Sequence, residues 1–163
     1  MDLYFKIPTT KLVSFSREHL YYEIDMLYGV SKVLWRGVKD PYLYNALLES
    51  LVIHASIIVD FFYKPAMKPD DAKAAHYMSD IKKWKEVLPP VNRHFRQFNK
   101  KRNKRVVHLS YNRLEVKPED RKWDSPILTR EIKKIVDLFL AHADPQRIDP
   151  QMYKLKDVSL EIK

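Results

Sequence analysis

The sequence predicts an all-α fold: a single-domain, antiparallel bundle of four main helices with short extra helices. Apolar residues recur at helical spacing in four long segments, and an N-cap residue followed by proline precedes two of them. Only Gly29 and Gly37 are glycines, where average usage would give roughly eleven, and this scarcity disfavours a turn-rich β sandwich or barrel. The 163 residues, 45% of them apolar, suit one domain with a substantial core.

Residues 1–15 lack a helical period, so we expect an extended arm there, with a short strand at Leu3–Ile7. A helix is predicted to begin near Ser16, because large apolar side chains then fall on one face: Leu20, Ile24, Leu27, Tyr28, Leu34 and Trp35. Gly37 stands where a glycine just beyond the helix end would terminate it.

Asp40-Pro41 has the form of an N-cap and first helical residue, and predicts a second helix that runs to Tyr63 and stops before Pro65. This helix is apolar over more than half of its circumference, so we expect it to be the central and most buried one. Its polar positions form a narrow stripe: Glu49, Ser56 and Asp60.

The connection 64–88 predicts a loop with short helices around Asp71–Tyr77 and Asp80–Glu86. Pro89-Pro90 is predicted to open the third long helix. Arg102 occupies a gap in the inward stripe of that helix, which consists of Val91, Phe95, Phe98, Val106 and Leu109.

Ser125-Pro126 predicts the N-cap and first residue of a fourth long helix that ends near His142. Its inward residues are expected to be Leu128, Ile132, Ile135, Val136 and Phe139. We expect the tail, residues 145–163, to be extended, with a short strand at Val158–Ile162. No repeat or domain boundary interrupts residues 16–143, which form the predicted bundle.

The composition excludes several classes of site. Two glycines cannot supply a Rossmann fingerprint or a P-loop, and the absence of cysteine excludes disulfides, Cys-ligated zinc and thiol nucleophiles. The histidines of the chain match no metal-ligand spacing, so we predict neither a metal nor a cofactor. No membrane span is expected, because His54 and Asp60 interrupt the longest apolar run. No signal peptide is expected either, so we expect a cytoplasmic protein.

The positive charge of the chain is concentrated in one segment. The formal net charge is +9, and residues 87–114 contain no acidic residue but eight cations: Arg93, Arg96, Lys100, Lys101, Arg102, Lys104, Arg105 and Arg113. Such a segment is either a solvated helix face or a surface that binds a polyanion. On a continuous helix one face would carry Lys101, Lys104, Arg105 and His108. We predict a nucleic-acid site in which Tyr111 stacks on a base and six cations bind phosphates: Arg96, Lys100, Lys101, Lys104, Arg105 and Arg113.

The segment Arg102-Asn103-Lys104-Arg105-Val106-Val107-His108 resembles the R-x(4–6)-H motif of the HEPN superfamily of small α-helical proteins. The resemblance extends over about residues 40–140, including NALLESLVIHASIIVDFFY and DDAKAAHY, which are similar to an uncharacterised bacterial family of that type. It implies a helical bundle that dimerises, so that two motifs face a shared cleft. Many members are metal-independent endoribonucleases of toxin, antiphage or RNA-processing systems, and others bind nucleic acid or nucleotides without cleaving.

The resemblance also implies roles for three residues. His108 would activate the ribose 2′-hydroxyl or protonate the leaving oxygen, Arg102 would hold the scissile phosphate, and Asn103 would orient either group. Two features depart from the active pattern. Some toxin members have a tyrosine two residues after the motif histidine, whereas here Tyr111 is three residues after His108. An ideal helix also places Arg102 and His108 about 120° apart. The structural alternatives are an Arg102 paired with a carboxylate such as Glu49 or Asp60, and a His108 bonded to a helix-end carbonyl.

Sequence therefore predicts an RNA-directed, HEPN-like protein of bacterial defence or toxin–antitoxin type, either an endoribonuclease or an RNA-binding relative. RNA, a second copy of the chain and a cognate antitoxin or other protein are the expected partners. The alternative is a non-catalytic helical interaction module whose basic face docks an acidic protein, and a purely structural subunit is a third. His54 shares a stripe with Leu47, Leu51 and Ile58, which favours a satisfied core histidine.

Overall fold

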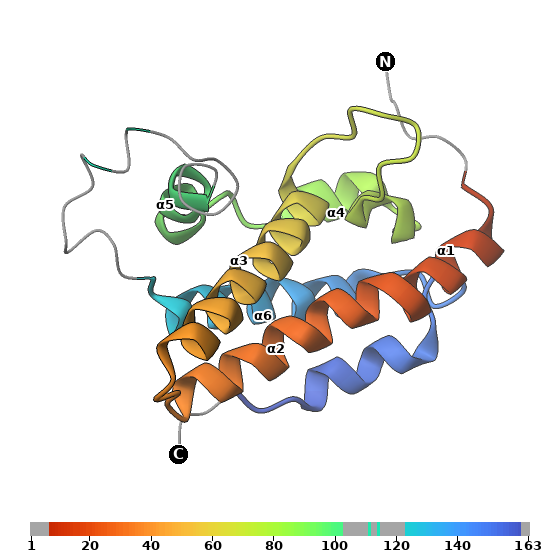
Figure 1. Cartoon of the computed structure of the whole chain (residues 1–163). Helices are drawn as coiled ribbons and strands as arrows, with labels where there is room; N and C mark the ends of the chain where they lie inside the picture. The colour runs from red at the N-terminus through yellow and green to blue at the C-terminus, as the bar shows by residue number, and fades with distance from the viewer. Residues whose placement is uncertain (1–6, 103–110, 112–113, 115–122, 161–163) are drawn as a thin grey trace.

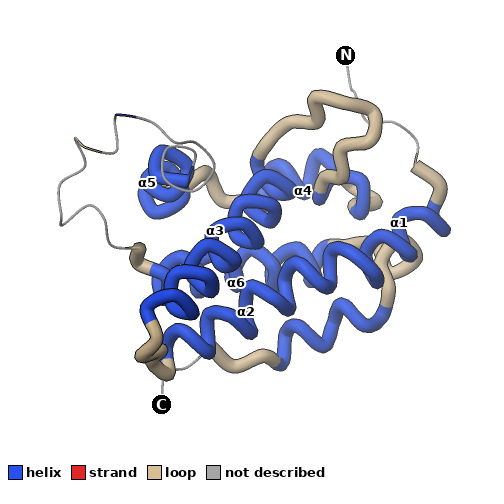
Figure 2. Tube along the Cα trace, viewed as in Figure 1, coloured by secondary structure: helices blue, strands red, loops and turns tan. Residues whose placement is uncertain are grey.

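A computed structural model describes residues 7–102, 111, 114 and 123–160 of the chain (Figure 1). Every regular element in this part is helical, and Figure 2 shows no strand among these residues. The predicted all-α class is confirmed for them. Three long helices form the centre: α2 (Tyr21–Trp35), α3 (Pro41–Tyr63) and α6 (Ser125–His142), with α3 packed against both of the others.

The chain enters the bundle as one continuous helical rod, coloured red to orange in Figure 1. α1 (Thr9–Phe15) leads into a π-helix, η1 (Ser16–Leu20), and η1 leads into α2. The predicted extended arm is therefore wrong from Thr9 onward. The predicted strand at Leu3–Ile7 lies outside the described residues except for Ile7, which is in no regular element.

α1 has no apolar stripe that a periodicity search could find, because Leu12 is its one buried residue. The π-helix η1 then joins α1 to α2. The Ser16 hydroxyl fixes this turn, since it donates to the carbonyl of Val13 at 2.8 Å and accepts from the Asp149 N–H at 2.9 Å.

The predicted boundary between α2 and α3 is confirmed. Gly37 has φ +90° and its N–H donates to the carbonyl of Leu34, as expected for a glycine that ends a helix. The Asp40 carboxylate accepts from the Leu43 N–H at 2.7 Å, with Pro41 as the first helical residue.

Only part of α3 is as buried as predicted. Its second half contributes a continuous run to the core, including Leu51, Ala55 and Ile58, all fully buried. Its first turns lie in solvent, where Tyr42 is 84% exposed, and Ile53 is 48% exposed farther along. α3 is therefore central, as expected, but all of its buried residues lie from Leu51 onward.

The length and composition of α3 alone would allow it to cross a membrane. Its most apolar window has a mean hydropathy of 1.6, and 44% of that window is buried inside the protein. No other helix among the described residues has these properties. The central helix of a globular core has the same length and composition, and α3 packs against three helices of this bundle.

The connection after α3 folds as predicted into short helices, η2 (Ala74–Tyr77) and α4 (Ile81–Val87). α5 (Arg93–Arg102) begins later than Pro89-Pro90, because the side chain of Asn92 caps it by accepting from the Phe95 N–H at 3.0 Å. Similarly, Asp124 rather than Ser125 caps α6, with its carboxylate 3.3 Å from the Ile127 nitrogen.

The C-terminal segment is not the extended tail that was predicted. Residues Pro150–Asp157 form a 3₁₀ helix, η6, which packs against α2 and α6. Asp149 caps it through the Gln151 N–H at 2.8 Å, and Met152 and Leu155 are fully buried. The described residues after it, 158–160, form no strand, and the rest of the predicted strand lies outside the described part.

The core is dominated by aromatic side chains. Phe139 of α6 makes near-perpendicular ring contacts with Phe61, Phe62, Tyr77 and Trp84, at centroid distances of 5.6 to 6.2 Å. This geometry is favourable for aromatic rings beyond the burial of their surface. The cluster joins α3, η2, α4 and α6 into one core.

One buried histidine gives the fold a pH dependence. Burial beside Lys73 lowers the pKa of His76, so the folded state holds the ring neutral at pH values where an unfolded chain, with a histidine pKa near 6.5, binds a proton. The free energy of unfolding is therefore expected to fall as the pH drops below about 6.5. Urea unfolding at pH 7.5 and 5.5 should show a smaller loss for His76→Gln than for the wild type. Exposed His19→Gln is the control, and equal losses in all three proteins would contradict the assignment.

Candidate nucleic-acid interface

Helix α5 has two faces of opposite character. Phe95 and Phe98 are buried against the bundle, and the Arg102 side chain on the same face is only 13% exposed. The opposite face carries three exposed cations at i, i+3 and i+7, which we call the cationic ridge: Arg93, Arg96 and Lys100. None of the three contacts a carboxylate of a described residue, so their charge faces solvent.

The start of α5 is fixed to α6. Besides capping the helix, the Asn92 amide donates to the Glu131 carboxylate at 2.8 Å. Glu131 also pairs with Lys134 at 2.6 Å. The ring of Phe95 lies 5.7 Å from that of Tyr63, whose pKa is raised to about 12 by burial and by the charge of Glu131.

The end of α5 is fixed to α3 through Arg102. One guanidinium nitrogen donates to the Asp60 carboxylate at 2.7 Å, and another donates to the Ser56 carbonyl at 3.1 Å. The guanidinium carbon also lies 5.8 Å from the centre of the Phe98 ring. Of the two carboxylates weighed from sequence, Asp60 is the partner, while Glu49 is exposed.

The structure separates the cations that the sequence groups together. Arg96 and Lys100 are exposed on the ridge, whereas Lys101 is half-buried and Arg102 faces the core. Tyr111 is 91% exposed and so accessible for stacking. Five predicted site residues lie outside the described part of the chain: Asn103, Lys104, Arg105, His108 and Arg113.

Arg93 is a basic residue that the sequence prediction does not include in the site. It lies three residues before Arg96, on the same helix face, but this is recognisable only once α5 is known to begin at Arg93. No sequence signal identified the backbone carbonyl of Ser56 as a partner of Arg102, since carbonyl acceptors depend on helix packing alone.

His54 is the core histidine that its stripe predicts. It is 8% exposed, and its Nδ1 lies 2.6 Å from a Glu23 carboxylate oxygen. The ring of Tyr22 packs edge-on against it at 5.7 Å. This pair joins α2 to α3, so its first role is to satisfy a polar group in their interface.

Among the described residues, no group of three or more His, Asp or Glu side chains is arranged to hold a metal ion. In comparisons with known proteins, no family model, no curated protein and no solved structure matches this chain. The site must therefore be interpreted from its own chemistry.

The position of Arg102 predicts a stability effect. The substitution Arg102→Met leaves Asp60 without its closest counter-ion. We therefore expect the free energy of unfolding to fall by about 1–3 kcal/mol. Asp60 is partly exposed and Lys64 lies 3.7 Å away, so the loss should be smaller than for a fully buried pair. Arg96→Met, on the exposed face of the same helix, should change stability by less than about 0.5 kcal/mol. Equal effects in urea denaturation would contradict the anchoring role.

Proposed function

We propose that this protein is RNA-directed and HEPN-like, and that the cationic ridge of α5 binds the RNA phosphate backbone. The observation that carries the proposal is the ridge itself: three cations on one exposed helix face, with no acidic residue between residues 87 and 114. Like charges at this spacing repel one another, and phosphates would relieve that repulsion.

Three further features support this interpretation. α5 is fixed at both ends, by Asn92 on Glu131 and by Arg102 on Asp60, so the ridge is held in place before any ligand arrives. Two of the three ridge residues are arginines, whose planar guanidinium matches a phosphate bidentately. The exposed Tyr111 supplies a ring on which an unpaired base can stack.

The proposal includes the wider expectations drawn from the resemblance. These are an antiparallel four-helix HEPN arrangement, a homodimer, a cytoplasmic location, and a defence or toxin–antitoxin role with a cognate antitoxin. The open side of α3 supports the homodimer, since Tyr42 and Ile53, about three turns apart on one face of the helix, are large apolar residues that lie exposed.

RNA binding stands ahead of RNA cleavage in this proposal because of Arg102. Two nitrogens of its guanidinium already donate to Asp60 and Ser56, and its Nε is buried without a partner among the described residues. In an endoribonuclease of the R-x(4–6)-H type, this arginine would hold the scissile phosphate together with Asn103 and His108. Such a role requires Arg102 to exchange an internal partner for the substrate.

The ridge predicts a salt-dependent affinity for RNA. Replacing Arg93, Arg96 and Lys100 together by alanine removes three phosphate contacts, which should reduce the slope of log affinity against log salt by about two for a single strand. Fluorescence anisotropy of a short labelled RNA, measured between about 50 and 200 mM salt, gives this slope.

The matched control replaces three exposed lysines elsewhere, Lys82, Lys83 and Lys154, and so removes the same charge. It should leave the slope close to that of the wild type. If the ridge variant and the control behave alike, the ridge is not the RNA site. In that case, salt-sensitive capture of an acidic protein, lost only in the ridge variant, would favour the interaction module.

The catalytic form of the proposal predicts metal-independent cleavage. In EDTA, the wild type should cut RNA and leave 2′,3′-cyclic phosphate ends, and His108→Ala should slow cleavage by about 10²- to 10⁴-fold. His94→Ala changes a histidine outside the motif and should have little effect. Cleavage that survives in purified His108→Ala would contradict the assignment, whereas wild-type RNA binding without cleavage identifies an RNA-binding relative.

A further inference from the structure

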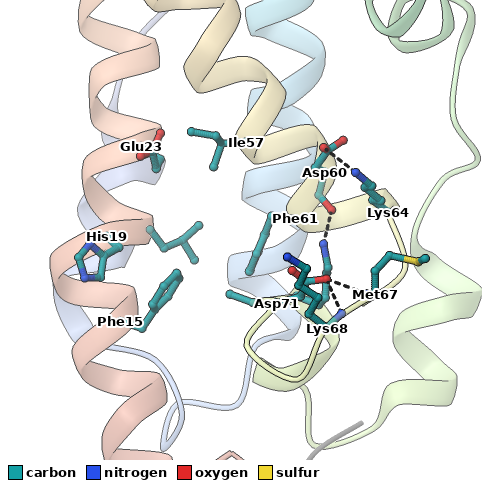
Figure 3. Close-up of a pocket in the computed structure, with 13 residues that line it drawn as sticks. Phe15, His19, Glu23, Ile57, Asp60, Phe61, Lys64, Met67, Lys68 and Asp71 are labelled. Atoms are coloured by element: carbon teal, nitrogen blue, oxygen red, sulfur yellow. Dashed lines mark hydrogen bonds and ion pairs between the residues drawn. The ribbon is translucent and has the colours of Figure 1, made fainter. Parts of the chain in front are cut away.

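A cavity of about 600 Å³ lies between the N-terminal helical rod and α3, closed at one end by the loop that follows α3 (Figure 3). Its volume is within the range of small-molecule sites. Six of the thirteen lining residues are apolar, and they come from all three segments: Phe15, Leu20, Ile57, Phe61, Met67 and Ala72. The cavity thus offers an apolar surface that no described side chain fills.

The π-helix η1 contributes directly to this cavity. Leu20 and His19 belong to η1, and Phe15 immediately precedes it. Single π turns are rare and occur frequently at functional sites. This turn is held by the fully buried Ser16, whose hydroxyl bonds to the Val13 carbonyl and the Asp149 N–H. The irregular helix is therefore a fixed part of the wall.

The carboxylates around the cavity are engaged by the protein itself. Glu23 lies 2.6 Å from His54, and Asp60 accepts from Arg102 at 2.7 Å. Asp71 accepts from the backbone N–H groups of Met67 and Lys68 at 2.6 and 3.0 Å, and these bonds lower its pKa. None of the three is left as an unpaired anion facing the cavity.

The lysines of the cavity have fewer hydrogen bonds within the protein than their ammonium groups can donate. Lys64, Lys68 and Lys73 all line it. Lys64 approaches Asp60 only at 3.7 Å, and Lys73 donates to the Asp60 carbonyl at 3.2 Å. An ammonium group has three donors, so each retains N–H groups for a ligand. With Arg102, which pairs with Asp60 from outside the cavity lining, four basic side chains accompany the three carboxylates.

We propose that this cavity binds a small organic anion with an apolar body. The apolar body would lie against Phe15, Ile57 and Phe61, and the anionic head, a carboxylate or a phosphate, would accept from Lys64, Lys68 and Lys73. This site is separate from the cationic ridge and does not depend on RNA binding.

The test is calorimetric titration of the full chain with two probes, laurate for a carboxylate head and 1-naphthyl phosphate for a phosphate head. Saturable binding of either probe is expected, and the one that binds identifies the head group. 1-Naphthol is the matched neutral ligand and should bind at least tenfold more weakly than its phosphate. Binding of neither anion, or binding of 1-naphthol as tight as that of 1-naphthyl phosphate, would overturn the proposal.

Variants locate the site. The double variant Lys64→Gln, Lys68→Gln should weaken binding at least tenfold, and both side chains are exposed, so folding should be retained. Ile57→Glu places a carboxylate on the apolar wall and should abolish binding. Val33→Glu makes a similar change at an exposed apolar residue of α2, outside the cavity lining, and should bind like the wild type. Circular dichroism confirms that each variant is folded, and undiminished binding by folded Ile57→Glu would overturn the assignment to this cavity.

Discussion

The ion pair between Asp60 and Arg102 is the interaction on which the arrangement around α3 depends. Asp60 lies in the last turn of α3, where the negative end of the helix dipole disfavours a carboxylate. Three cations converge there and offset this cost. Arg102 arrives from α5, Lys64 from the same helix, and Lys73 donates to the Asp60 carbonyl from the loop before η2. One acidic residue thus fixes α5, the end of α3 and the following loop together.

Capping chemistry made much of the fold predictable from sequence. Asp40-Pro41 and Gly37 mark the boundary between α2 and α3 because each has a local conformational requirement that few residues satisfy. Asp149-Pro150 has the same form and begins η6, so the C-terminal helix was readable by the rule that located α3. The apolar residues of η6 did not indicate a helix, because a 3₁₀ helix has three residues per turn and not the 3.6 of an α-helix.

Other features could not be read because they depend on contacts distant in sequence. The π turn at Ser16 is stabilised by the backbone N–H of Asp149, which lies 133 residues away in the sequence. The choice of Asp60 rather than Glu49 as partner of Arg102 depends on which turn of α3 meets the end of α5. Of the cationic face expected at Lys101, Lys104, Arg105 and His108, only Lys101 lies in the described part of the chain, and it is half-buried because burial of Phe95 and Phe98 sets the rotation of α5.

The eight cations of the basic segment are therefore not equivalent. Arg102 is neutralised inside the protein, where it positions α5, while the ridge residues on the opposite face keep their charge toward solvent. Asp60, the partner of Arg102, also lines the cavity beside α3. An anion bound to Lys64 there would compete with Asp60 for that lysine and leave Arg102 as the principal counter-ion of the carboxylate. The two proposed sites thus meet at Asp60, which pairs with Arg102 of α5 and lines the cavity.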